Sequence, residues 1–195
     1  CTRKTCPLPK NCSVPAVKWM RQLASRNKKQ SKTSQKEFTP YTQRPIELWT
    51  KYKLMPDLPE KLHFDIDETL GGTKAPLTAR LLFLQRHLSK IDLIETFPKL
   101  SLAILCAQLK IPQRNFSTYR HLERGPHSRR EILQYMIKEL DIFIYARDLE
   151  KLSVSLSAFD AFLCSYIGLL WESGKCTKMP KGFPKASGGG EHPRV

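Results

Sequence analysis

Acidic residues are scarce in this sequence of 195 residues, and long apolar runs are missing. Only 18 Asp and Glu stand against 33 Lys and Arg, which gives a formal net charge of +15. The longest apolar run, residues 156–171, is shorter than the ~20 residues of a membrane-spanning helix and contains Asp160. The amino end shows no basic-then-apolar leader. We therefore expect neither a membrane protein nor a secreted one, and the predicted location is cytoplasmic.

Several catalytic patterns are missing as well. The pair Gly71–Gly72 stands alone, without the further glycines of a phosphate-binding loop. The five histidines are scattered, and their positions indicate no Ser–His or Cys–His arrangement. Neither nucleophilic catalysis nor a nucleotide-binding loop is therefore supported.

The positive charge predicts nucleic acid as the partner, because a surplus of this size attracts polyanions. A basic surface with no role in binding is the alternative. The candidate binding segment is a stretch where arginines stand among Tyr and His residues; its arginines are Arg120, Arg124, Arg129 and Arg130. Arginine among aromatic rings suits phosphate and single-strand contacts. A solvated loop followed by a helix start explains the same segment without any ligand.

Composition divides the chain into three segments. Residues 1–37 carry ten Lys or Arg and one acid, Glu37, which predicts a loop-rich basic arm. Residues 38–175 have the apolar periodicity of a compact domain. Residues 176–195 are rich in Lys, Gly and Pro, and predict a poorly ordered tail.

Helical periodicity recurs along the middle segment. We expect helices over residues 45–52, 76–88, 100–109, 129–140 and 157–171, the fourth started by a capping box of Ser128 and Glu131. Residues 91–97 predict a strand that ends at Pro98, whereas residues 141–146 fit either a strand or the end of a helix. Helices around a strand predict an α/β layer structure. Because one strand is not a sheet, its neighbours are expected in a part of the protein before Cys1.

Two acids stand among apolar residues and are candidate metal ligands. Glu95 lies at the carboxyl end of the predicted strand, where α/β sheets place their sites. Asp160 lies inside an otherwise apolar helix. A buried carboxylate requires a metal ion or a cationic side chain, so an ion pair with an arginine is the alternative for Glu95. For Asp160 the alternative is a capping box with Ser157 as the N-cap.

Six cysteines without a leader predict reduced thiols or metal ligands. Cys1, Cys6 and Cys12 are close enough in sequence to bind Zn²⁺ as thiolates. Three ligands are too few for a closed structural site, so a fourth would have to come from elsewhere. Free thiols are the alternative to a zinc-organised interaction protein.

Four stretches resemble, in the same order, motifs of an uncharacterised bacterial family of predicted ribonuclease H-like nucleases. The first is FTPYTQRPIELW at residues 38–49, and the second is DETLGG at 67–72, followed by APLTAR at 75–80. The third is ETFP at 95–98, and the fourth is FDAFLC at 159–164. The resemblance extends over residues 38–171.

The resemblance implies a ribonuclease H-like α/β fold that is incomplete here, with its amino-terminal strands missing. It also implies a metal-dependent nuclease that hydrolyses phosphodiester bonds in nucleic acid, with Mg²⁺ or Mn²⁺ held by Glu95 and Asp160. The acid that the family carries on its first strand has no counterpart, since Glu37 is the only acid in residues 1–37. The alternative function is a non-catalytic module of the same fold that binds nucleic acid or serves in assembly.

Overall fold

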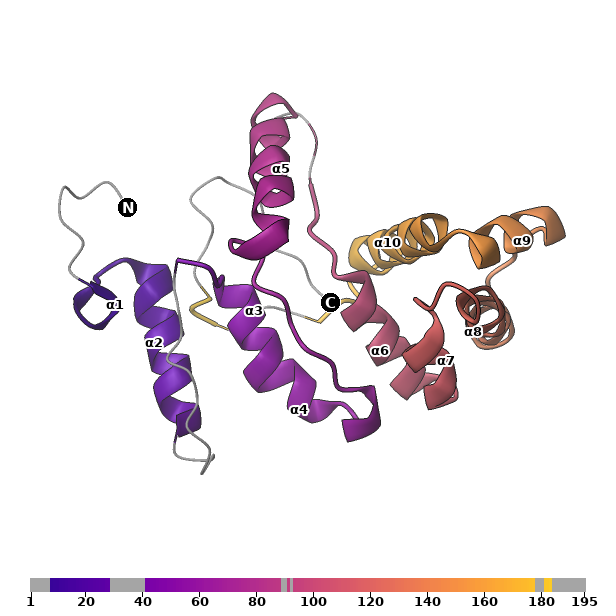
Figure 1. Cartoon of the computed structure of the whole chain (residues 1–195), viewed down its shortest axis with the longest axis horizontal. Coiled ribbons are helices and arrows are strands. Elements are labelled where there is room, and N and C mark those ends of the chain that lie inside the picture. Colours follow the sequence, from indigo (N-terminus) through magenta and orange to yellow (C-terminus); the bar gives the residue numbers. More distant parts are fainter. Residues whose placement is uncertain (1–7, 29–40, 89–90, 92, 178–180, 184–195) are drawn as a thin grey trace. The chain divides into compact units, whose positions relative to one another are not determined.

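The computed structural model describes residues 8–28, 41–88, 91, 93–177 and 181–183, which fold into helices and connecting segments (Figure 1). The chain divides into two compact units. The first unit comprises Cys1–Asp57, Phe64–Ile94 and Met179–His192, and the second comprises Leu58–His63, Glu95–Lys178 and Pro193–Val195. Neither unit is therefore a continuous stretch of sequence. The expected boundary between arm and domain, at residues 37–38, lies outside the described residues.

In the first unit, short helices surround a small apolar core. Its described elements are α1 (Leu8–Asn11), α2 (Pro15–Lys28), α3 (Pro45–Trp49), the π-helix η1 (Thr50–Leu54), α4 (Met55–Asp57), the 3-10 helix η3 (Gly72–Lys74) and α5 (Ala75–His87). Helix α2 packs against α3. Met20 and Leu23 lie three positions apart on α2, hence on one face, and they form a buried core with Leu48 and Trp49 of α3.

The second unit is a bundle of helices around a larger core. Its described elements are the 3-10 helix η2 (Glu60–Leu62), α6 (Pro98–Gln108), α7 (Gln113–Thr118), α8 (Gly125–Glu139), α9 (Ala146–Val154) and α10 (Leu156–Glu172). Helix α8 packs against α7 and α9, and α10 packs against α6, α8 and α9. No described helix is by itself long and apolar enough to cross a membrane; α9 and α10 reach that length and composition only together, across a bend of 115°.

The buried faces of these helices explain the core of the second unit. Helix α6 is buried over most of its circumference, and α8 and α10 each contribute an apolar stripe. The side chains with almost no exposed surface include Leu100, Leu102, Tyr119, Ile132, Leu133, Met136, Phe159 and Leu163. Cys176, in the predicted tail, is also buried, and its thiol lies 3.7 Å from the carbonyl oxygen of Ile167.

Prolines mark the starts of several helices. Pro45, Pro76, Pro98 and Pro126 lie in the first turns of α3, α5, α6 and α8, and α2 begins at Pro15. Proline suits the first turn because its missing N–H would have no partner within the helix there. The expected helices over residues 76–88, 100–109 and 157–171 are confirmed, within two residues, as α5, α6 and α10.

The predicted α/β ribonuclease H-like fold is wrong for the described part of the chain, which contains no strand. Residues 93–97 have no regular secondary structure and lead into α6 at Pro98. Residues 141–146 fit either a strand or the end of a helix by sequence. In the structure residues 142–145 are irregular, and α9 begins at Ala146. Alternating apolar residues are compatible with a strand. A strand also requires a neighbour that accepts and donates its ladder hydrogen bonds, and no other described segment supplies one.

Both capping-box interpretations are also wrong. Helix α8 begins at Gly125, so Ser128 lies inside it, and the Ser128 hydroxyl lies 2.7 Å from the Thr118 hydroxyl. Helix α10 has Ser155 as its N-cap, and the Ser155 side chain accepts a hydrogen bond of 3.2 Å from the backbone N–H of Ala158. Asp160 therefore lies beyond the first turn of α10, where it cannot cap the helix.

Candidate functional site

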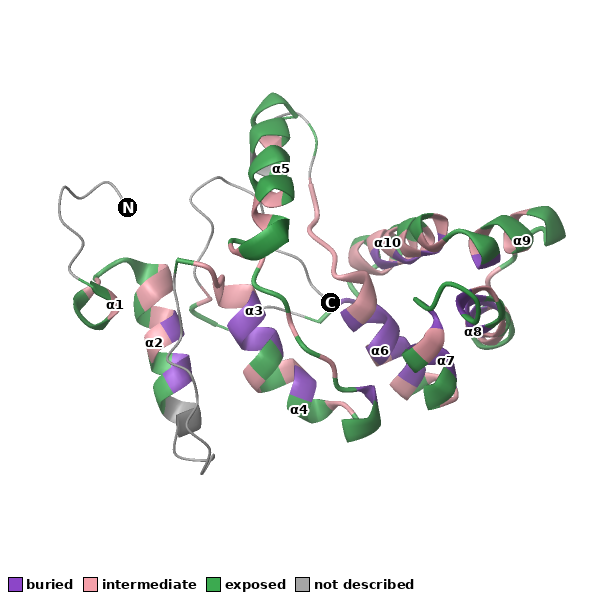
Figure 2. Cartoon of the chain, in the orientation of Figure 1, coloured by how far each residue is buried: buried purple, intermediate pink, exposed green. Residues whose placement is uncertain are grey.

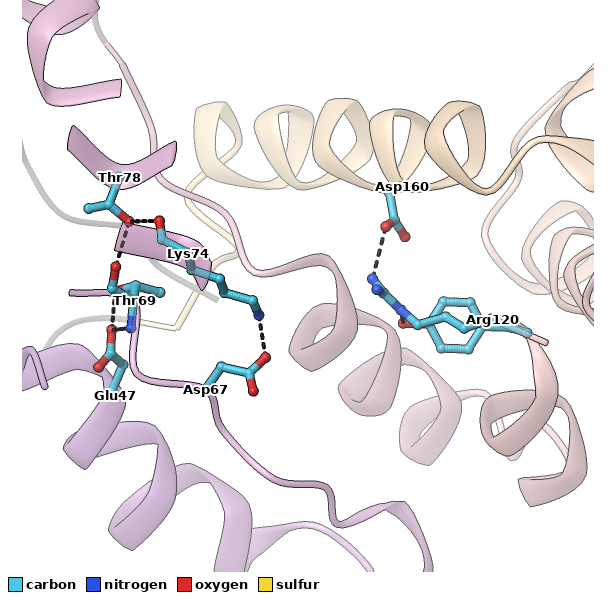
Figure 3. A network of polar contacts seen from close by, with 8 residues as sticks. Glu47, Asp67, Thr69, Lys74, Thr78, Arg120 and Asp160 are labelled. Carbon is cyan, nitrogen blue, oxygen red and sulfur yellow. Dashed lines mark hydrogen bonds and ion pairs between the residues drawn. The ribbon is translucent and has the colours of Figure 1, made fainter. Parts of the chain in front are cut away.

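Asp160, the predicted helix ligand of a metal, has an arginine as its partner. Its Oδ2 accepts a hydrogen bond of 2.9 Å from Nη2 of Arg120, and a quarter of its side chain is exposed (Figure 3). Its other oxygen, Oδ1, is buried and has no hydrogen-bond partner among the described residues. Burial raises the pKa of Asp160, while Arg120 and Arg129 act in the opposite direction. The carboxylate is thus paired with a cationic side chain of the protein itself, although the two arginines offset only part of the effect of burial.

An aromatic cluster holds Arg120 in place. Its Nε donates a hydrogen bond of 2.8 Å to the hydroxyl of Tyr119, and its guanidinium lies 5.3 Å from the centre of the Tyr119 ring. Tyr119 is almost fully buried between Phe116 and Phe159, at centroid distances of 6.0 and 5.9 Å. Burial raises the pKa of Tyr119, so its hydroxyl remains protonated near neutral pH. Arg120 therefore connects α10 to the segment that follows α7.

Arg129 is buried and bound by backbone carbonyl groups. Its Nε donates to the carbonyl of Ser153 at 2.7 Å and its Nη2 to that of Val154 at 2.9 Å, while Nη1 donates to the carbonyl of Tyr119. Burial lowers the pKa of Arg129, although Asp160 raises it. Gly125 leaves the space that the guanidinium needs, since a Cβ there would lie 2.5 Å from Nη1 and 2.8 Å from the Tyr119 oxygen. Arg129 is therefore not exposed to a phosphate group.

The other predicted nucleic-acid contacts differ in their exposure and partners. Arg130 is exposed and forms an ion pair of 3.2 Å with Glu150. Arg124 is exposed as well, and within the described residues it forms no ion pair. Together with Arg120, half of whose side chain is exposed, these residues present less free positive charge than the sequence indicates.

Glu95, the other predicted metal ligand, is half-buried in the irregular segment that precedes α6. Mg²⁺ in proteins has six oxygen ligands, usually including one or two carboxylates. Within the described residues, no group of three or more His, Cys, Asp or Glu side chains is placed to hold a metal ion. Glu95 and Asp160, the latter already paired with Arg120, do not by themselves make a metal site, and binding of Mg²⁺ or Mn²⁺ stays a prediction from the resemblance.

The predicted zinc ligands fall mostly outside the described residues. Cys1 and Cys6 lie there, and Cys12 is half-buried with a free thiol. The zinc hypothesis therefore stays a prediction.

Cys164, one turn beyond Asp160 on α10, lies 3.0 Å from the hydroxyl of Thr96.

A buried carboxylate that sequence reasoning missed is Glu47, in the first unit. Its oxygens accept hydrogen bonds from the backbone N–H of Arg44 at 3.0 Å and from Nε of Arg44 at 2.9 Å. They also accept from the hydroxyl and N–H of Thr69 (Figure 3). The Thr69 carbonyl in turn accepts a hydrogen bond of 2.8 Å from the hydroxyl of Thr78. Glu47 and Thr69 together therefore connect the motifs at residues 38–49, 67–72 and 75–80, which the resemblance identifies separately.

The net charge is distributed unevenly along the chain. Residues 1–57 contain thirteen Lys and Arg against three Asp and Glu, a surplus of ten. Residues 95–177, which form most of the second unit, contain eleven Lys and Arg against nine Asp and Glu, a surplus of two. Two thirds of the formal charge of +15 therefore lies in the first 57 residues.

Comparison with models of protein families finds no match, and comparisons with curated proteins and with solved structures find none either.

Proposed function

We propose that the protein binds nucleic acid through the basic surface of its first unit. The observation that carries this proposal is the composition of residues 1–36, which contain ten Lys and Arg and no Asp or Glu. Positive charge without neighbouring carboxylates remains available to phosphates, and binding gains free energy because counterions leave the nucleic acid. The function is that of a binding module, and it requires no metal ion.

The described part of this basic region has a stable support. Helix α2 is anchored by Met20 and Leu23 in the core of the first unit, while Lys18 on the same helix is exposed. Arg21 is committed to the backbone of α1, because its Nη1 donates to the carbonyls of Pro9, at 3.0 Å, and Lys10. Among the side chains that the structure describes before residue 58, the exposed cations are Lys10, Lys18, Lys51 and Lys53.

The second unit is a weaker candidate for this binding. Its charges nearly balance, and Arg129 is enclosed by backbone carbonyls. Arg120 and Arg130 already have carboxylate partners, Asp160 and Glu150. A phosphate would have to compete with these carboxylates for the guanidinium groups.

A matched pair of charge-neutralised chains tests the location. In one chain, Lys10, Lys18, Lys51 and Lys53 are replaced by Gln; in the control, four exposed lysines of the second unit are replaced, namely Lys110, Lys138, Lys151 and Lys175. Both chains lose the same charge, and exposed substitutions of this kind change stability by less than about 0.5 kcal/mol. Affinity for a labelled single strand and a labelled duplex is measured by fluorescence anisotropy at several salt concentrations.

We expect the slope of log affinity against log salt to become shallower by up to about 3 in the first-unit chain, since each phosphate contact contributes about 0.7 to 0.9. The control should retain the slope of the wild type. Equal losses in the two chains would contradict the assignment to the first unit. Absence of binding at low salt by the folded wild-type chain would contradict the function itself.

Phosphodiester hydrolysis stays a prediction from the resemblance, and it is tested separately. We expect no cleavage of DNA or RNA by this chain in the presence of Mg²⁺ or Mn²⁺, because Asp160 is paired with Arg120 and the described residues form no group of three or more metal-binding side chains. Cleavage that is lost in both Glu95→Gln and Asp160→Asn would show that these carboxylates act as the resemblance implies. Nucleic-acid binding that persists in both variants would then separate the two functions.

A further inference from the structure

Helix α5 presents a row of leucines to solvent. Leu77, Leu81, Leu84 and Leu88 follow one another at spacings of four, three and four residues, and 70%, 54%, 43% and 38% of their surfaces are exposed. At 3.6 residues per turn these positions fall within a narrow strip along the helix. The strip continues past the carboxyl end of α5, since Leu88 is its C-cap. Four adjacent exposed leucines are unusual on a surface that has no partner.

The helix is attached to its own unit through a different face. The hydroxyl of Thr78 donates to the carbonyl of Thr69 at 2.8 Å, and both Thr78 and Gln85 are half-buried. Most of the remaining surface of α5 is exposed (Figure 2). The leucine strip therefore lies beside the attached face and is accessible along its length.

The spacing of the leucines identifies the shape of the surface that would cover them. Alternation of three and four residues is the heptad pattern by which two helices pack side chains into one another. A helix that lies on a lipid surface has a broader apolar face opposite a charged one. On α5, Arg80 borders the strip directly, whereas Arg86 and the exposed Phe83 lie outside it, toward the far side of the helix. A second helix fits this narrow strip better than a membrane does.

The positive charge beside the strip indicates which flanking residues a partner helix would carry. Residues 75–88 contain Arg80, Arg86 and His87 and no acidic residue. In heptad terms, Arg80 and His87 flank the leucines on one side, and Thr78 and Gln85 flank them on the other. A second copy of α5 would bring no carboxylate to Arg80, whereas a helix with glutamates at its flanking positions would pair with it.

We propose that α5 is the docking surface for an amphipathic helix of a partner protein, with a leucine-type seam and acidic flanking residues. Leu77, Leu81, Leu84 and Leu88 pack into the partner's seam, and Arg80 pairs with a carboxylate at its edge. This role goes beyond nucleic-acid binding and is independent of it, because the cations of the proposed nucleic-acid surface lie on other elements.

Three designed peptides probe this surface on the full chain. The first is a helical peptide with leucines at heptad spacing and glutamates at the flanking positions. The second has the same seam and lysines in place of the glutamates, and the third has the composition of the first in scrambled order. The scrambled peptide controls for the attraction of any acidic peptide to a chain with a charge of +15. Binding is measured by fluorescence anisotropy, and circular dichroism checks that each variant is folded.

Two charge reversals on the same helix provide a matched comparison. Arg80→Glu should weaken binding of the glutamate-flanked peptide about three- to tenfold and improve binding of the lysine-flanked one, because flanking charges determine the choice of partner. Arg86→Glu makes the same change of charge on the far side and should alter either affinity by less than about twofold. Leu81→Ser should weaken the binding of both peptides at least about tenfold, since it removes an apolar contact from the middle of the seam.

Four results would overturn the proposal. The first is no saturable binding of the glutamate-flanked peptide by the folded wild-type chain, and the second is equal weakening by Arg80→Glu and Arg86→Glu. The third is self-association of the wild type, measured by sedimentation, that Leu81→Ser abolishes, since it would identify a second copy as the occupant. The fourth is adsorption to anionic vesicles that Leu81→Ser abolishes, which would identify a membrane.

Discussion

Replacement of Gly125 by alanine should destabilise the second unit, although Gly→Ala in a helix usually does the opposite. Gly125 is buried at the start of α8, and an added Cβ would lie 2.8 Å from the carbonyl oxygen of Tyr119 and 2.5 Å from Nη1 of Arg129. The Tyr119 oxygen belongs to the backbone and cannot move without its chain. The methyl group would therefore separate Arg129 from one of the carbonyls that bind it.

The size of the effect follows from three contributions. Overpacking of a tight site costs about 1 to 3 kcal/mol, and weakening a hydrogen bond from a buried charged group costs about 1 to 3 kcal/mol more. The higher helix propensity of alanine returns at most about 1 kcal/mol. We therefore expect Gly125→Ala to lower the free energy of unfolding by about 2 to 4 kcal/mol, which lowers the Tm by roughly 4 to 16 °C in a chain of this size.

The control is Gly168→Ala in α10, where an added Cβ would meet no atom within 4 Å. The free energy of unfolding of this variant should be about 0.5 to 1 kcal/mol higher than that of the wild type, because only the helix propensity changes. Urea unfolding followed by circular dichroism measures both variants, and hydrogen exchange of α8 peptides locates the loss in the second unit. If Gly125→Ala were as stable as Gly168→Ala, the contact between Arg129 and the Tyr119 carbonyl would contribute nothing to the fold.

Two further predictions concern titrating groups of the second unit. Burial raises the pKa of Asp160, so the native chain takes up this proton at a higher pH than the unfolded chain does. The free energy of unfolding of the wild type, relative to that of Asp160→Asn, should therefore rise as the pH falls through the native pKa and level off below the unfolded pKa. Urea unfolding of both chains between about pH 7 and pH 3 measures this difference. The opposite slope would mean that the effect of Arg120 on the pKa outweighs that of burial. Burial also raises the pKa of Cys106 to about 12. Iodoacetamide at about pH 8 should spare Cys106 in the native chain and alkylate it in urea, as peptide mass spectrometry would show, and fast native alkylation would contradict its burial.

Helices α5, α6 and α10 were predictable because local signals agreed with one another. Pro76 and Pro98 mark the first turns of α5 and α6, and the apolar spacing that follows each proline continues to the end of the helix. The choice of N-cap was not predictable, because Ser155 and Ser157 are both suitable residues two positions apart. Only Ser155, with an extended backbone, has its side chain in reach of the Ala158 N–H.

The candidate site was less predictable, because its polar groups are defined by distant partners. Arg129 is bound by carbonyls at Ser153 and Val154, more than twenty residues further along the chain. Glu47 accepts from Thr69, which lies 22 residues away. No local pattern distinguishes such residues from exposed ones. The prediction of a strand at residues 91–97 was wrong for a related reason. Alternating apolar residues define one face of a strand but contain no information about the neighbouring strand that it needs.

The two basic regions differ in the type of cation and in the acids near it. Arginine has five donors in a planar arrangement, which lets Arg129 bind carbonyls on two segments and Arg120 connect Tyr119 with Asp160. Arginines in a segment with nearly as many acids therefore form hydrogen bonds and ion pairs within the fold more readily. A stretch such as residues 1–36, which has ten cations and no acid, has no local carboxylate to neutralise it. This absence of acids in residues 1–36 is why we propose the first unit, and not the arginine cluster of the second unit, as the nucleic-acid surface.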